Sequence, residues 1–184
     1  MQNHLGTNSF RQIVENHQEK VRNLCFRYLN NIDDAEDIAQ EVFIQVFESL
    51  NSFRDEAQIS TWIYRIAVNK SIDHLRKKKR KKRFSKLVSI FGFYEDENEF
   101  EIPSSENPQK SYELNEKRDH LNRAIDSLPE NQKAALILSK FEGFSNKEIS
   151  EILNTSVSAV EALNNRAKKN LHKKLYDFYS KNLK

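Results

Sequence analysis

Glycine and proline are scarce in this chain of 184 residues, which contains only three of each. Folds rich in β-strands need many tight turns, and these two residues usually supply them. The scarcity therefore predicts an all-α protein. The three glycines, Gly6, Gly92 and Gly143, also lie far apart, which excludes a glycine-rich phosphate-binding loop.

Apolar residues recur at steps of three and four along most of the chain, which is typical of helices that bury one face. We expect Ser9 to cap the first helix and Pro129 to lie in the first turn of the fifth. The helices predicted from the pattern cover residues 10–28, 35–50, 60 to at least 75, 111–127, 129–141, 145–153 and 157–178.

The stretch 84–110 lacks this periodicity and contains Pro103 and Pro108. It is long for a connection inside one compact domain, although it has room for one short ordered piece. We therefore predict two small helical domains, residues 8–83 and 111–184, joined by a flexible linker at 84–110.

The charged residues are segregated, although the formal net charge is only +3. Residues 1–94 carry 16 basic and 11 acidic side chains, residues 95–110 carry one and six, and residues 111–184 carry 13 and 10. Residues 76–83 are eight consecutive cations, a pattern that indicates either a solvated helix end or a polyanion-binding segment. The acidic segment 95–101 is either a solubilising linker or a mimic of nucleic acid.

The C-terminal part carries the pattern of a helix-turn-helix. Ser145 and Glu148 have the spacing of a capping box, and Asn154 is a residue type that tolerates the left-handed conformation of a tight turn. Ser156 can cap the next helix, whose outer face is polar and basic. Such a helix can enter the major groove of duplex DNA, but an ordinary amphipathic helical hairpin would show part of the same pattern.

The third predicted helix is apolar around most of its circumference, so its few outward polar groups stand out. Asn69 lies between Arg65 and Arg76 on this stripe. An amide beside dense positive charge suits single-stranded nucleic acid, which needs edge contacts and a path for its phosphates. A solvated polar position is the alternative for Asn69, and core packing is favoured over base stacking for Trp62 and Tyr64.

Catalysis and membrane insertion are not indicated. The five histidines are isolated, and no spacing of His or Cys suits a metal, so we expect no enzyme activity, metal or cofactor. The single cysteine, Cys25, cannot form an internal disulfide. No apolar run approaches the length of a membrane span and no signal-peptide core is visible, so we expect a soluble cytoplasmic protein.

Two sets of motifs are specific enough to indicate a family. The N-terminal motifs at 34–44, 60–69 and 72–77 closely resemble region 2 of the extracytoplasmic-function (ECF) group of sigma-70 RNA polymerase sigma factors. Short motifs at 128–130, 141–143, 148–149, 160–161 and 166–168 resemble region 4 of the same group. The resemblance implies a subunit that directs core RNA polymerase to specific promoters and initiates transcription there.

The resemblance also implies site residues and partners. The −10 promoter element is read in this family as a single strand, with one base flipped into a pocket near the loop 51–57. The residues implied for this contact are Phe53, Arg54, Arg65, Asn69, Arg76, Lys79 and Arg80. For the −35 element, read as duplex, they are Ser158, Glu161, Ala162, Asn165, Arg166 and Lys169. For the β′ clamp helices of the polymerase they are Asp34, Asp37, Gln40 and Glu41. The implied partners are core polymerase (β′ clamp helices and β flap), promoter DNA and, as for many proteins of this group, an anti-sigma factor.

Two residues depart from the family pattern. Asn164 stands where an apolar residue is common, and Glu161 where a basic residue is frequent. Both departures affect which base sequence we expect the protein to prefer at the −35 element. A competing interpretation is a self-sufficient regulator that binds duplex DNA through the helix-turn-helix, with residues 1–94 as a dimerisation or sensing module.

Overall fold

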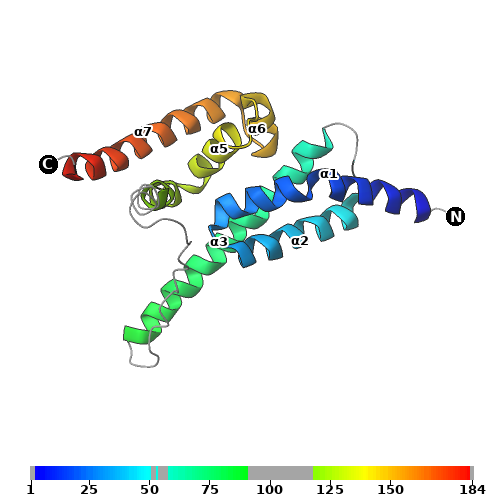
Figure 1. The fold of residues 1–184 in the computed structure, drawn as a ribbon, viewed down its shortest axis with the longest axis horizontal. Coiled ribbons are helices and arrows are strands. Elements are labelled where there is room, and N and C mark those ends of the chain that lie inside the picture. Colours follow the sequence, from blue (N-terminus) through cyan, green and yellow to red (C-terminus); the bar gives the residue numbers. More distant parts are fainter. Residues whose placement is uncertain (1–2, 51–52, 54–57, 91–117, 183–184) are drawn as a thin grey trace, which may run out of the picture.

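The computed structural model describes residues 3–50, 53, 58–90 and 118–182, and within these residues it contains helices and no strand (Figure 1). The all-α prediction is therefore confirmed. The helices are α1 (Asn3–Leu29), α2 (Ile32–Ser49), α3 (Ile59–Ile90), a helical segment at 118–126, α5 (Glu130–Lys140), α6 (Asn146–Ile152) and α7 (Val157–Asn182).

Helices α1, α2 and α3 pack against one another and form an N-terminal module. A tight turn joins α1 to α2. Asn30 has a positive φ of 52°, and the side chain of Asn31 caps α2 by accepting a hydrogen bond of 2.8 Å from the backbone N–H of Asp34. Asparagine suits both positions, because it tolerates the left-handed conformation and is a strong N-cap.

Two helices extend beyond their predicted ends. The prediction that Ser9 caps the first helix is wrong, because α1 already begins at Asn3. Helix α3 continues to Ile90, so the first seven residues of the predicted linker are helical. No proline or glycine interrupts residues 59–90, and lysine and arginine are good helix formers, so nothing in this stretch ends the helix earlier. Residues 91–110 of the predicted linker lie outside the described residues.

The C-terminal module contains the predicted helix-turn-helix, α6 and α7. Ser145 and Glu148 form the capping box, Asn154 adopts a positive φ of 50°, and the Ser156 hydroxyl accepts a hydrogen bond from the N–H of Ala159. Gly143 also has a positive φ, 74°, as expected for a residue just past α5. Pro129 is the N-cap of α5 and not its first residue, because the helix begins at Glu130.

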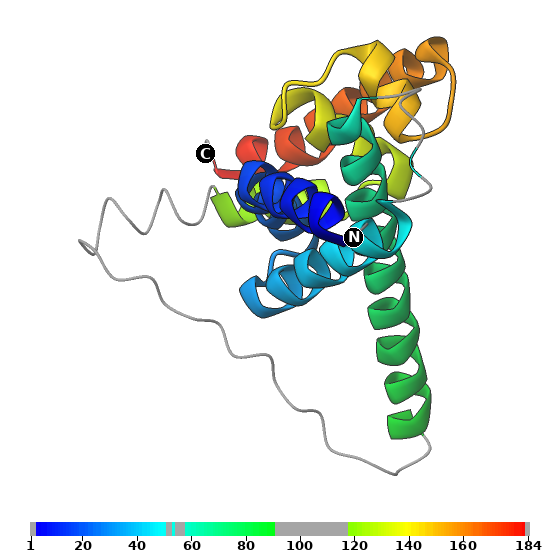
Figure 2. The ribbon, with the colours of Figure 1, turned by 90° about the vertical axis from the view of Figure 1, so that its right-hand side faces the viewer.

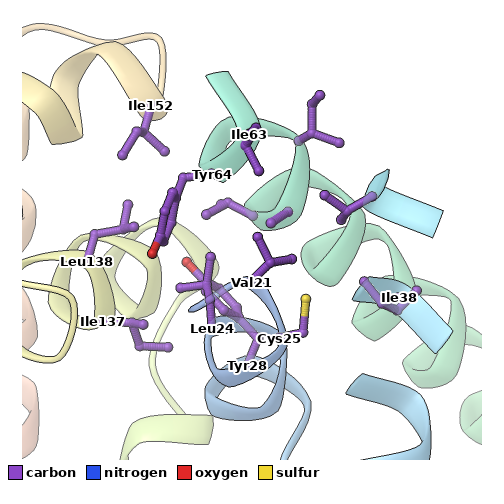
Figure 3. Packing of buried hydrophobic residues seen from close by; sticks show 14 of the residues in the cluster. Val21, Leu24, Cys25, Tyr28, Ile38, Ile63, Tyr64, Ile137, Leu138 and Ile152 are labelled. Atoms are coloured by element: carbon purple, nitrogen blue, oxygen red, sulfur yellow. The ribbon is translucent and has the colours of Figure 1, made fainter. Parts of the chain in front are cut away.

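The two modules share one buried apolar cluster (Figure 3). Leu24 and Tyr28 of α1 and Tyr64 of α3 lie in the same cluster as Ile137 of α5 and Ile152 of α6. A second, smaller cluster joins the segment 118–126 to α5 and α7. Each module thus has packed helices of its own, and the C-terminal module also packs against α1 and α3.

Helix α3 is the longest element and projects well beyond the rest of the N-terminal module (Figure 2). Its projecting part carries the run of eight cations at 76–83. The described side chains of this run are all exposed. The run therefore lies along an exposed helical surface, where Arg76 pairs with Glu130 and Lys78 with Asp34.

Candidate nucleic-acid interface

Asn69 is exposed on α3, while its neighbours Ala67 and Val68 are buried in the core. Its amide therefore faces solvent, and the predicted polar stripe is present. Next along the helix, the Lys70 ammonium forms an ion pair of 3.1 Å with the carboxylate of Glu41 in α2. Glu41, a predicted polymerase-binding residue, therefore contacts the residue that directly follows Asn69, the predicted base-reading residue.

The aromatic residues near this stripe have different environments. Tyr64 is buried and packs edge-on against Phe144, with ring centroids 4.8 Å apart. Trp62 is half-buried against the core, and its ring centroid lies 4.8 Å from that of Phe53. Core packing, favoured by the sequence for both residues, is therefore confirmed. Arg54, which was expected beside Phe53, lies outside the described residues.

Arg65 and Arg76, predicted to hold phosphates, both contact the C-terminal module. Nη2 of Arg65 donates a hydrogen bond to the backbone carbonyl of Glu151 in α6. Nη2 of Arg76 lies 2.8 Å from a carboxylate oxygen of Glu130 at the start of α5, and its Nη1 lies 3.4 Å from Asp73. The bond to Glu130 is the main cause of the raised pKa of Arg76.

Further along α3, Lys79 and Arg80 are exposed, as predicted. Lys78 forms an ion pair of 3.1 Å with Asp34 of α2, and His74 lies 3.4 Å from the same carboxylate. Asp34 is thus half-buried under α3, whereas Asp37 and Gln40 are exposed on α2. Of the predicted polymerase-binding residues, Asp37, Gln40 and Glu41 are exposed, and only Asp34 is half-buried.

The predicted DNA-reading face of α7 is open. Its exposed residues are Ser158, Glu161, Asn165, Arg166 and Lys169, and Ala162 is half-buried. Val160 and Ala167 are fully buried on the opposite side of the helix. Amphipathic spacing therefore fixes which side of α7 faces outward.

Asn164 lines an open polar groove of about 320 Å³ between α5, α6 and α7. The other residues of the groove are Ser139, Lys140, Asn146, Glu161, Asn165 and Lys168. Asn164 is half-buried, so its amide replaces an apolar residue at the edge of the core without being sealed inside it. Glu161 shares this groove, so the two departures from the family pattern lie together.

Sequence reasoning missed the residues that join the modules. Lys133 of α5 donates hydrogen bonds of 2.7 Å to the carbonyl of Tyr28 and to the Asp126 carboxylate. Arg27 of α1 lies 3.3 Å from the Glu142 carboxylate and 4.8 Å from the Phe141 ring centroid. These partners on α1 are more than 100 positions away along the chain, so no local pattern could have indicated them.

No metal site is assembled in the part of the chain that the structure describes. It contains no cluster of three or more His, Cys, Asp or Glu side chains that could bind a metal ion. Burial raises the pKa of the Cys25 thiol to about 11, so the thiol is a poor nucleophile near neutral pH. None of the described helices combines the length and apolar character needed to cross a membrane.

Comparisons with known proteins agree with the two-module architecture. The family model for sigma-70 region 2 matches residues 13–81, and that for sigma-70 region 4 matches residues 118–171. These matches define a bacterial transcription initiation factor of the sigma-70 type. The chain is 32% identical to the ECF RNA polymerase sigma factor SigW of Bacillus subtilis, over 92% of this chain and 90% of that protein. It is 33% identical to the ECF RNA polymerase sigma-E factor of Escherichia coli K12, over 91% of this chain and 86% of that protein.

Solved structures show the same fold. CnrH, in complex with the cytosolic domain of CnrY, matches with a TM-score of 0.65 over 92% of this chain and 88% of its own. The sigma factor RpoE of Bartonella quintana, in complex with the anti-sigma factor NepR, matches with a TM-score of 0.64 over 91% and 96%. Both are 20% identical to this chain, so they support the fold alone. The chain belongs to the ECF sigma factors, which direct RNA polymerase to specific promoters.

Proposed function

We propose that this sigma factor reads the −10 element as a single strand through α3 and the −35 element as duplex through α7. The observation that carries the proposal is the placement of Asn69, an exposed amide on the polar stripe of α3, beside the exposed cations at 76–81. Flipping a base out of the stack costs a few kcal/mol, so a pocket must bind the exposed base well to offset that cost.

In this proposal Asn69 contacts the edge of the flipped base, and Phe53 and Arg54 of the loop 51–57 complete the pocket. The exposed cations Lys79 and Arg80 bind phosphates, together with Arg65 and Arg76 once these are released from the C-terminal module. Such contacts displace counterions, so binding should weaken steeply as salt rises.

At the −35 element, α7 enters the major groove with its exposed face. Arg166 and Lys169 are suited to phosphates or guanine edges, and Ser158 and Asn165 to other base edges. Glu161 can accept a hydrogen bond from cytosine. The polar groove beside Asn164 would then lie next to the DNA and modulate this preference.

We further propose a non-catalytic, cytoplasmic factor that needs no cofactor and acts with core polymerase. Asp37, Gln40, Glu41 and Asp34 on α2 would dock on the β′ clamp helices, and the C-terminal module on the β flap. The functional domains would be residues 8–83 and 111–184, with 84–110 as the linker. An anti-sigma factor is a further proposed partner, since the similar structures of CnrH and RpoE are complexes with CnrY and NepR.

The test combines the purified protein with core polymerase and a promoter library. Sequencing of the transcript ends should give specific start sites, which Asn69→Ala and Arg166→Ala should each abolish or shift. Asn16→Ala and Arg22→Ala, at exposed positions of α1, are matched controls and should leave the start sites unchanged. Tight sequence-specific duplex binding by the protein alone, with no effect on polymerase, would instead favour a self-sufficient regulator.

A further inference from the structure

We propose that the polar groove between α5, α6 and α7 is a binding site for one acidic amino acid, of the class of L-glutamate, and that the bound molecule competes with duplex DNA for α7. The contacts of the binding site come from the groove alone. The effect on DNA rests on the proposed function of α7, because Glu161 and Asn165 belong both to the groove and to the residues proposed for the −35 element.

The half-buried residues of the groove, its floor, are neutral polar side chains from three helices. Ser139 lies near the end of α5, Asn146 begins α6 and Asn164 lies on α7. Within the described part of the chain, none of these three side chains forms a hydrogen bond to another residue. Half-buried amides and hydroxyls need partners, so the floor requires water or a ligand that both donates and accepts.

The exposed residues of the groove, its rim, carry the charges. Lys140 is the last residue of α5, and Glu161, Asn165 and Lys168 follow at helical spacing on the same face of α7 as Asn164. No ion pair among the described residues involves Lys140, Glu161 or Lys168. The groove therefore presents two ammonium groups and one carboxylate, a net charge of +1, for an external partner.

This lining selects the chemistry of the ligand. None of the lining side chains is apolar or aromatic, so a ligand with an apolar body or a stacking base would gain little by burial there. A simple anion would pair with the two lysines but would be repelled by Glu161. A molecule with two carboxylates and one ammonium group matches all three charges of the rim, because each of its ionic groups then faces an opposite charge.

The size and the floor of the groove agree with this ligand class. A volume of about 320 Å³ holds roughly ten water-sized groups of about 30 Å³ each, which is the size of one acidic amino acid. The amides of Asn146 and Asn164 can donate to a carboxylate and accept from an ammonium group. An apolar residue in place of Asn164 would remove the half-buried amide of α7 from the floor, so the site depends on this departure from the family pattern.

A bound amino acid would use groups that α7 needs for DNA. Its ammonium group would occupy the Glu161 carboxylate, and its carboxylates would neutralise Lys168, which lies beside the reading face. Coupling between two sites is reciprocal, so a ligand that weakens duplex binding is itself bound less tightly when the duplex is present. The groove would thus link the −35 affinity of this protein to the concentration of a small metabolite.

The first arm of the test is calorimetric titration of the full-length protein with L-glutamate, without DNA and at constant ionic strength. The proposal expects saturable binding to one site. Lys140→Gln and Asn164→Leu should each weaken it about fivefold or more, as for loss of an exposed ionic contact or of the floor amide. Lys174→Gln and Asn16→Leu, at exposed positions of α7 and α1 outside the groove, are the matched controls. Circular dichroism verifies that all variants are equally helical.

The second arm compares L-glutamate with glutarate, which has both carboxylates but no ammonium group. The parent protein should prefer L-glutamate about fivefold, and Glu161→Gln should remove this preference, because it removes the partner of the ammonium group. Equal affinities for the two compounds in the parent would mean an adventitious ion only, and an absence of saturable binding would overturn the site outright.

The third arm measures binding of duplex promoter DNA by fluorescence anisotropy, with L-glutamate or with glutarate at the same ionic strength. L-glutamate should weaken duplex binding about fivefold, the lower end of the range for coupled sites, and Asn164→Leu should abolish this effect. Unchanged duplex affinity would overturn the competition. If Lys140→Gln weakened duplex binding while L-glutamate did not bind, the groove would hold DNA phosphates and the proposal would be wrong. Failure of the proposed function would appear differently, since Arg166→Ala would then leave duplex affinity unchanged whatever the calorimetry shows.

Discussion

The two surfaces that we propose for nucleic-acid binding differ in whether their cations already have partners in the structure. On α3, Arg65 and Arg76 are bonded to the C-terminal module, whereas Arg166 and Lys169 on α7 are exposed. No ion pair among the described residues involves an α7 cation. Similar residue types therefore have different availability, which depends on packing between modules and not on local sequence.

If α3 reads the −10 element and α7 the −35 element, as we propose, the two surfaces differ in how accessible their cations are to DNA. A duplex can approach α7 while the modules are still in contact, but a strand that needs Arg65 and Arg76 cannot bind them fully. The following predictions probe the two surfaces and the packing that makes them unequal, beginning with the largest expected effect.

Leu24→Ala should lower the free energy of unfolding by about 2–5 kcal/mol, the range for a buried leucine. Leu24 is fully buried in the cluster shared by the two modules, so its cavity should destabilise both. Urea denaturation followed by circular dichroism measures the change. Leu121→Ala, at a side chain that is 38% exposed, is the control and should cost far less. An equally small loss for Leu24→Ala would contradict the shared core.

Lys133→Met should lower the free energy of unfolding by about 1–3 kcal/mol, because it leaves the Tyr28 carbonyl without its donor. The methionine side chain is similar in length to that of lysine, so the loss of stability reflects mainly the lost hydrogen bonds of Lys133. Thermal unfolding measures it, with Lys140→Met, exposed at the end of the same helix, as the control. No difference between the two variants would mean that the Lys133 contacts contribute no measurable stability.

Arg166→Ala should reduce the slope of log affinity against log salt by about 0.9 for duplex promoter DNA, the value for one phosphate contact. Arg76→Ala should change the slope for the same duplex less, since its guanidinium is held by Glu130. Fluorescence anisotropy at several salt concentrations gives both slopes. Equal reductions would remove the contrast between the two surfaces.

The capping box should make the C-terminal module slightly sensitive to acid. Hydrogen bonds from the Ser145 hydroxyl and backbone N–H hold the pKa of the Glu148 carboxyl below its usual value. This stabilisation is present above the pKa of the unfolded chain and is lost as the pH falls through the lower folded pKa. Unfolding measured at several acidic pH values should show this loss in the parent and not in Glu148→Gln. Identical pH profiles would show that the box contributes no measurable stability.

Local features of the fold followed from the sequence to a large extent. The capping box at Ser145 and the left-handed turn at Asn154 were both visible from residue types that favour these roles. The helix ends were harder to predict. Ser9 can cap a helix, but serine is also tolerated inside one, and here the helix begins earlier.

The site was predictable only in part, for a physical reason. Periodicity indicates that Asn69 faces outward, because its neighbours must be buried for α3 to pack. It cannot indicate that Glu130 lies against Arg76, since the two are 54 positions apart and either would look like a solvated charge. Long-range pairing depends on how the modules dock, and no spacing along the chain encodes that.

The unbroken course of α3 also sets a length scale. Asn69 and Arg83 are 14 residues apart on a single helix, which at 1.5 Å per residue corresponds to about 21 Å. Within duplex DNA that distance corresponds to roughly six base steps of about 3.4 Å each, and an unstacked single strand covers it with fewer nucleotides. If Asn69 captures a base as proposed, the straight helix determines which phosphates can contact its far end, because they must lie about 21 Å from that base.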